Sequence, residues 1–180
     1  FQDDDTSASM MADIIFSEAY TSSAAPKLHI QGSPTSELAT RTSLYTPSTM
    51  FHGPRMQSVV SLDTVGKRTI AGIAEAREAS GWLPDTPRPL FLLDPLLLDN
   101  ASQFVLFYLY ENGLPATALL PFFIESIDVY GPCTALSAQV KVSASLTTLS
   151  ERSTEANVEI LDENGSLWGR VTNINSRSAG

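Results

Sequence analysis

Two polar side chains inside a strongly apolar stretch are the first candidates for chemistry in this chain. Residues 94–113 read DPLLLDNASQFVLFYLYENG, and Asp99 and Gln103 lie among leucine, phenylalanine, alanine and valine. Because these two residues are four positions apart, they share one face of a helix. A carboxylate in such surroundings must be paired, neutralised or open to a cleft. Asp99 is therefore the first candidate functional residue, with Gln103 beside it.

Few other residues suggest a reaction. The chain holds two histidines, His29 and His52, and one cysteine, Cys133. A single cysteine excludes a disulfide framework within this sequence and a thiolate metal cluster, and it favours a reducing, cytoplasmic location. The sequence has no phosphate-binding loop, dinucleotide fingerprint, zinc-ligand spacing or nucleophile elbow, so we expect neither a metal nor a bound cofactor.

Composition limits the classes of partner. The 180 residues fit one domain or two small ones, and 43% hydrophobic with 17% charged residues favours a packed core over disorder. A formal net charge of −9 argues against nucleic acid and against anionic membrane surfaces. We find neither a signal peptide nor a membrane-spanning run. The first residue is Phe1, which indicates a piece of a longer protein.

The apolar stretch carries signals for both ends of a helix. Asp94 suits the N-cap and Pro95 the first helical position, where a missing N–H costs nothing. Asn112 and Gly113 supply a left-handed stop. A helix that is apolar all round is a buried one, and this helix is too short and too polar near its start to favour a membrane span.

The remaining sequence predicts strands on both sides of this helix. Strands are expected at 12–20, 27–31, 57–65, 69–76, 119–131 with a bulge, 136–146, 156–162 and 166–173. Asn164-Gly165 predicts the hairpin between the last two. We divide the chain into 1–50, with N-terminal strands and a Ser/Thr/Pro-rich linker, and 51–180. The order indicates an α+β hotdog fold, an antiparallel sheet wrapped round a long central helix, although other α+β folds share this pattern.

Four segments carry a resemblance to a known family. They are FHGPRMQSVVSL (51–62), DPLLLDNASQ (94–103), LLPFFIESIDVYGP (119–132) and VEILDENGSLWGRV (158–171). In this order they resemble the second half of a dehydratase domain of the polyketide synthase or polyunsaturated fatty acid synthase type. That family is a double hotdog, and its second-half motif is His-Pro-x-Leu-Leu-Asp-x-x-x-Gln/His. Pro95, Leu97, Leu98, Asp99 and Gln103 match it, and Asp94 replaces the histidine.

The resemblance implies an activity and its residues. The reaction is the syn elimination of water from a 3-hydroxyacyl thioester held on the phosphopantetheine arm of an acyl carrier protein. Asp99 would help to expel the 3-hydroxyl, and Gln103 would hold that carboxyl or the leaving hydroxyl. A carboxyl in an apolar tunnel has its charged form disfavoured, which lets it act as an acid near neutrality. We assign four residues to the substrate-binding wall: His52, Gly53, Pro54 and Phe107. A purely structural role is the alternative for His52.

The chain departs from the family at the histidine that removes the α-proton. That residue belongs to a His-x-x-x-Gly-x-x-x-x-Pro motif in the first hotdog, and neither His29 nor His52 begins this pattern. Residues 1–50 are too few for a full first hotdog, so we expect a truncated or partial one. The chain is then a catalytically incomplete half, a degenerate dehydratase-like domain that docks or dimerises, or one whose histidine comes from another chain. A hotdog thioesterase is a weaker alternative.

Pairing follows from the fold. A lone hotdog leaves a sheet face and a sheet edge open, and proteins usually cover such an edge. We therefore expect a homodimer or a pseudo-dimer, with the acyl carrier protein and neighbouring synthase domains as partners.

Overall fold

The structure is a computed structural model, which describes residues 11–22, 24–34, 41–47, 49–77, 82–86, 91, 93–114, 119–132, 138–150 and 152–178. The elements in chain order are β1 (Ser33–Pro34), α1 (Arg41–Leu44), the 3-10 turn η1 (Pro54–Met56), β2 (Val59–Val65), β3 (Thr69–Glu75), α2 (Pro95–Glu111), β4 (Leu119–Val129), β5 (Gln139–Leu149), β6 (Ser153–Leu161) and β7 (Leu167–Ser178). No described helix is long and apolar enough to cross a membrane.

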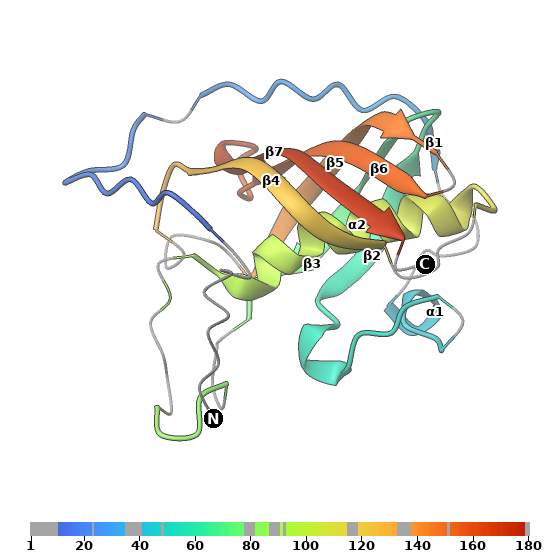
Figure 1. Cartoon of the computed structure of the whole chain (residues 1–180), viewed down its shortest axis with the longest axis horizontal. Helices are drawn as coiled ribbons and strands as arrows, with labels where there is room; N and C mark the ends of the chain where they lie inside the picture. Colours follow the sequence, from blue (N-terminus) through green and yellow to red (C-terminus); the bar gives the residue numbers. More distant parts are fainter. Residues whose placement is uncertain are drawn as a thin grey trace, which may run out of the picture.

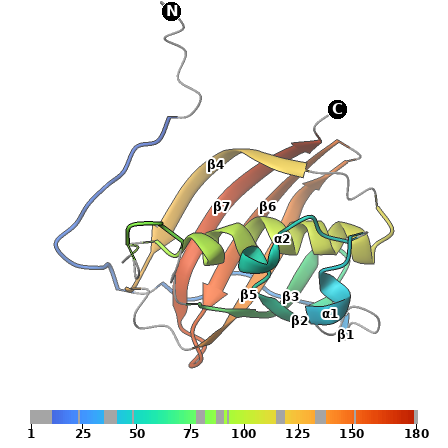
Figure 2. The ribbon, with the colours of Figure 1, turned by 90° about the horizontal axis from the view of Figure 1, so that it is seen from below.

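One antiparallel sheet holds every described strand, in the order β1-β2-β3-β5-β6-β7-β4. The strands curve round α2, which lies across one face of the sheet (Figures 1 and 2). This arrangement confirms the α+β hotdog fold expected from the order of the elements. The β2–β3 hairpin, the central helix and the four strands that follow it all form close to their predicted positions.

The central helix begins and ends where its sequence indicates. The Asp94 side chain accepts the backbone N–H groups of Leu96 at 2.8 Å and Leu97 at 3.1 Å. Asn112 caps the C-terminus, and Gly113 follows with a φ of 63°, the left-handed conformation that glycine adopts without strain. Most residues between the caps are buried, as the lack of a polar face predicts.

The core forms between α2 and the inner face of the sheet. Strand β5 turns Val140, Val142, Ala144 and Leu146 inward, and each is at most 2% exposed. This matches the predicted alternation. The predicted bulge in β4 is also present, as a shift of register between Pro121 and Phe123.

The prediction of two N-terminal strands, at 12–20 and 27–31, is wrong. The structure has no strand in either range. Residues 24–32 cross the outer face of the sheet instead (Figure 1), where the Glu159 carboxylate accepts the N–H groups of Lys27 and Leu28 at 3.0 Å. A side chain of β6 therefore binds the N–H groups that a neighbouring strand would have taken. Within the described part of 1–50, the only strand is the two-residue β1, which pairs with β2.

The predicted boundary at residue 50 stays a prediction. Leu44 is fully buried and Met50 is 6% exposed, and both belong to the same apolar core as α2. Residues just before the boundary therefore contribute to the hotdog itself.

Candidate functional site

The Asp99 carboxyl is the centre of a polar cluster in the first half of α2. Its Oδ2 accepts a hydrogen bond from Gln103 Nε2 at 2.6 Å and lies 3.2 Å from Nε2 of His52. The Asp99 side chain is 27% exposed and the His52 side chain 10%. Both contacts recorded for this carboxyl in the described part of the chain are made by Oδ2.

Gln103 is held in one orientation. It is fully buried; its Nε2 also donates to the backbone oxygen of Met56 at 2.9 Å, and its Oε1 accepts from the Tyr45 hydroxyl at 2.5 Å. Turning the amide over would place its oxygen against two acceptors, the Met56 carbonyl and the Asp99 carboxylate. The amide N–H therefore points at Asp99.

Tyr45 supports Gln103 from the loop before β2. Its hydroxyl oxygen accepts the backbone N–H of Val59 at 2.9 Å while its proton goes to Gln103. The Tyr45 ring packs edge-on against Phe107, with ring centroids 5.7 Å apart and an interplanar angle of 79°. A chain of hydrogen bonds thus runs from the start of β2 through Tyr45 and Gln103 to Asp99.

The His52 ring is fixed by its neighbours. It stacks on Phe51 with ring centroids 4.4 Å apart, and its backbone oxygen accepts from Gln57 Nε2 at 2.9 Å. Arg77 donates to the backbone oxygen of Gln57 at 2.9 Å and so ties this loop to β3. Nδ1 of His52 is buried and has no hydrogen-bond partner among the described residues.

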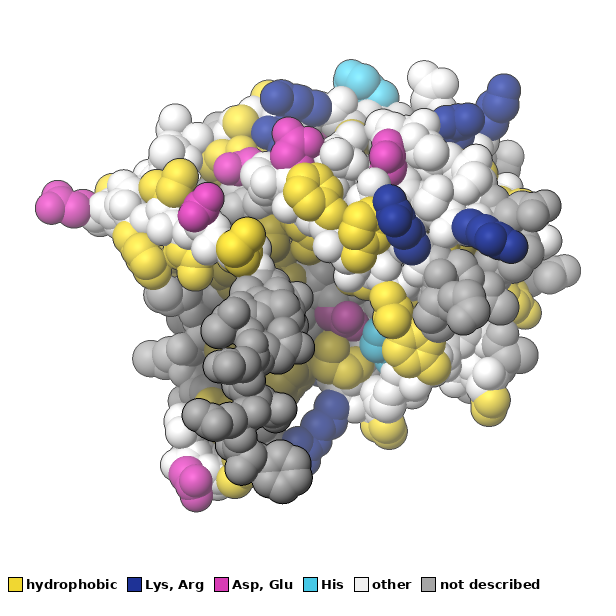
Figure 3. Space-filling view, in the orientation of Figure 1, with side chains coloured by type: hydrophobic (Ala, Val, Ile, Leu, Met, Phe, Trp, Pro, Cys, Tyr) yellow, Lys and Arg dark blue, Asp and Glu magenta, His cyan; other side chains and the backbone are white. Residues whose placement is uncertain are grey.

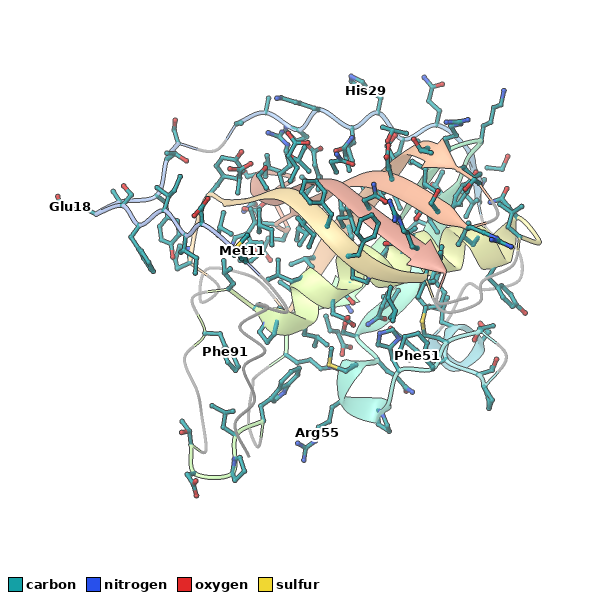
Figure 4. All side chains as sticks on the ribbon, viewed as in Figure 1. Met11, Glu18, His29, Phe51, Arg55 and Phe91 are labelled. Atoms are coloured by element: carbon teal, nitrogen blue, oxygen red, sulfur yellow. The ribbon has the colours of Figure 1, made fainter. Side chains whose placement is uncertain are left out.

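The cluster lies in a hollow of the surface. In Figure 3 an acidic side chain and a histidine lie side by side in a recess with hydrophobic side chains next to them. The chain has two histidines, and His29 lies on the opposite side of the molecule (Figure 4), so the histidine in the recess is His52. Phe51 is 64% exposed beside it.

The structure brings three predicted site residues together and places the others around them. Asp99, Gln103 and His52 are in contact. Gly53 and Pro54 follow His52 in an exposed turn. Phe107 is fully buried behind Tyr45. Their assignment to a substrate-binding wall stays a prediction.

The sequence does not indicate Tyr45 as a site residue, and it predicts His52 as a wall or structural residue and not as a contact of Asp99. The available signal was weak: Leu44-Tyr45 is an apolar pair within a Ser/Thr/Pro-rich stretch. Cys133 lies outside the described residues. In the described ranges, no group of three His, Cys, Asp or Glu side chains is placed to hold a metal ion.

Close to the cluster, the N-cap of α2 also carries an ionisable group. Burial raises the pKa of the Asp94 carboxyl above its ordinary value, while the hydrogen bonds from Leu97 and Leu96 lower it. Asp94 stands where the motif of the resembled family has histidine, and in this structure its side chain caps the helix.

Comparisons with known proteins agree on one family. A sequence model described as the polyketide synthase dehydratase N-terminal domain matches residues 28–180. GphF dehydratase 1 superposes with a TM-score of 0.65 at 17% identity, covering 86% of this chain and 53% of that chain. The dehydratase domain of RzxB from Pseudomonas fluorescens gives a TM-score of 0.60 at 17% identity, covering 82% and 54%. A trans-AT polyketide synthase dehydratase domain from Brevibacillus brevis gives 0.60 at 15% identity, covering 79% and 48%.

These solved structures show the fold, and this chain spans about half of their length. The matching description names an N-terminal domain. Our assignment to the second hotdog rests on the motif that contains Asp99 and Gln103, and it stays a prediction.

Proposed function

This chain belongs to the polyketide synthase dehydratase family, and we propose that it is a dehydratase-type domain of a multidomain fatty acid or polyketide synthase. The substrate would be a 3-hydroxyacyl thioester on the phosphopantetheine arm of an acyl carrier protein, and the product a trans-2-enoyl thioester. One observation carries this proposal. A carboxyl oriented by Gln103 lies beside His52 in a hollow flanked by hydrophobic side chains.

The geometry favours Asp99 Oδ1 as the atom that meets the substrate. Oδ2 already has the Gln103 amide and the His52 ring nitrogen next to it, so a proton for transfer is best placed on Oδ1. From Oδ1 the proton would pass to the 3-hydroxyl, which leaves as water. A positioned general acid of this kind contributes roughly 10²- to 10⁴-fold to a rate.

A dehydration assay tests the proposal. The chain would be mixed with a 3-hydroxyacyl pantetheine thioester, and the enoyl product would be measured by mass spectrometry. Asp99→Asn keeps the shape of the side chain but removes the acid, so we expect at least about a 100-fold loss of rate. Asp63→Asn is the matched control, because Asp63 is an exposed acid on β2. Equal rates for the chain and its Asp99→Asn variant would contradict the proposal.

A non-catalytic role within a synthase is the second candidate. Neither histidine begins the family's His-x-x-x-Gly-x-x-x-x-Pro pattern, and the chain spans about half of the matched dehydratases. A domain of this kind would bind the acyl thioester or organise its neighbours without turnover. Calorimetric binding of the thioester with no enoyl product in the same assay would favour this role over the enzymatic one.

Strand β4 offers the surface for the expected pairing. It is an outer strand of the sheet, and five large apolar side chains on it are between 38% and 51% exposed: Leu120, Phe122, Phe123, Ile124 and Ile127. An apolar edge strand is a ready template for another strand. We propose that a second hotdog unit covers this edge, from a second copy of the chain or from the longer parent protein.

Sedimentation equilibrium tests pairing between two copies. We expect the chain to form a dimer and the double variant Phe122→Lys/Ile124→Lys to remain a monomer, because lysines on an edge strand oppose strand addition. An unchanged dimer in the variant would contradict pairing through β4. If the unmodified chain is a monomer, pairing between two copies is excluded, and only a second hotdog within a longer protein could cover β4.

A further inference from the structure

Resting on the proposed function, we propose that His52 is the base of this site, so that one hotdog unit supplies both proton transfers of the elimination. His52 Nε2 would remove the proton from C2 of the 3-hydroxyacyl thioester, and Asp99 would protonate the departing hydroxyl. The chain would then need no histidine from another hotdog.

The His52 ring presents one nitrogen to the site. Nε2 lies 3.2 Å from Asp99 Oδ2, whereas Nδ1 is buried within the protein. A substrate in the hollow can therefore reach the ring only from the Nε2 side. The ring stacks on Phe51, and the Gln57 side chain holds the backbone of His52, so Nε2 keeps its position beside the carboxyl.

The other histidine cannot serve. His29 lies on the outer face of the sheet (Figure 4), on the far side from the hollow, and it is exposed. Within this chain, His52 is thus the only imidazole next to Asp99. A base is required because the C2 proton must leave as the C3–O bond breaks.

The proton count closes. The step requires a lone pair on His52 Nε2 and a proton on Asp99 Oδ1. Nε2 takes the C2 proton, the C2–H electron pair forms the C2=C3 bond, the C3–O bond breaks, and the Asp99 proton joins the hydroxyl to give water. An imidazolium and a carboxylate remain within ion-pair distance. His52 then releases the Nε2 proton to water and Asp99 takes a proton from water at Oδ1, which restores both groups.

The test uses the whole chain and four variants in the dehydration assay. His52→Gln should lower the rate by 100-fold or more, and His29→Gln should leave it unchanged as the matched control. His52→Ala leaves a space for a free base, so added imidazole should restore much of its rate. Imidazole should not restore the rate of Asp99→Asn. Thermal unfolding of each variant checks that it folds.

A second readout follows the C2 proton alone. In D2O the parent chain should exchange the C2 hydrogen of the thioester for deuterium, as seen by NMR, and His52→Gln should not. These results separate the two proposals. Loss of activity in Asp99→Asn with normal activity in His52→Gln would keep the proposed function and overturn the role of His52. A parent chain with neither exchange nor dehydration would overturn both.

Discussion

The hydrogen-bond chain from Tyr45 through Gln103 to Asp99 predicts a strong energetic coupling between the first two residues. The Tyr45 hydroxyl meets Gln103 Oε1 at 2.5 Å and also accepts the Val59 N–H, and both Gln103 and Val59 are fully buried. Tyr45→Phe leaves the buried Gln103 Oε1 without the hydroxyl that donates to it, and it removes one hydrogen bond of Val59. The unsatisfied acceptor costs about 1–3 kcal/mol and the lost Val59 hydrogen bond about 1 kcal/mol, so we expect a loss of roughly 2–4 kcal/mol of unfolding free energy.

Gln103→Leu removes three hydrogen bonds and leaves the Tyr45 hydroxyl, the Met56 carbonyl and the Asp99 carboxyl without the amide. Asp99 is partly exposed, so water can replace its bond, and a loss of roughly 2–4 kcal/mol is again expected. In the double variant the Tyr45 hydroxyl and Gln103 Oε1 are both absent. Neither group is then left buried without its partner, so the double variant should lose about 2 kcal/mol less unfolding free energy than the sum of the two single variants.

Urea unfolding of the four proteins of this double-mutant cycle measures the coupling. Thr148 and Glu155 form the control pair, because they share an exposed hydrogen bond of 2.7 Å between neighbouring strands. That exposed cross-strand pair should couple by less than about 1 kcal/mol. Losses at Tyr45 and Gln103 that add to within about 0.5 kcal/mol would refute a shared buried network.

Three further predictions concern the helix cap, the outer face of the sheet and one turn. Burial raises the pKa of Asp94, so at pH values just above the ordinary carboxyl pKa the native state binds more protons than the unfolded chain. The contribution of Asp94 to stability should therefore fall as the pH rises through this range. Asp94→Asn should remove this pH dependence in urea titrations, whereas Asp94→Ala should also lose about 1 kcal/mol of capping. Glu159→Gln should cost about 1.5–3 kcal/mol, because the partly buried Arg170 loses its charged hydrogen-bond partner. Hydrogen exchange at Lys27 and Leu28 should also become faster. Gly165→Ala should cost about 1–2 kcal/mol in thermal unfolding, because the φ of Gly165 is 78°. Gly53→Ala is the control and should be near neutral, because the φ of Gly53 is −67° and no atom lies within 4 Å of an added Cβ.

The parts of the fold that were predictable depend on local chemistry. The central helix has a capping acid at Asp94, a proline at its first position and a glycine after its end, so its limits follow from neighbouring residues alone. The Asn164-Gly165 turn is likewise a local signal, and the structure places Gly165 in the left-handed conformation that such a turn needs.

The parts that were missed depend on contacts between distant segments. Tyr45 meets Gln103 across 58 positions of sequence, and no periodicity around Tyr45 indicates that partner. The strand predicted at 27–31 failed because the Glu159 carboxylate, 131 positions from Leu28, takes the backbone N–H groups there. His52 reaches Asp99 only because the turn before β2 folds back onto the start of α2.

The most direct measurement is a crystal structure of the chain with an unreactive amide analogue of a 3-hydroxyacyl pantetheine thioester. We expect the 3-hydroxyl within hydrogen-bond distance of Asp99 Oδ1, with C2 facing Nε2 of His52 and the acyl chain along the hydrophobic side of the hollow. An analogue bound elsewhere, or a 3-hydroxyl turned away from Asp99, would contradict this expectation.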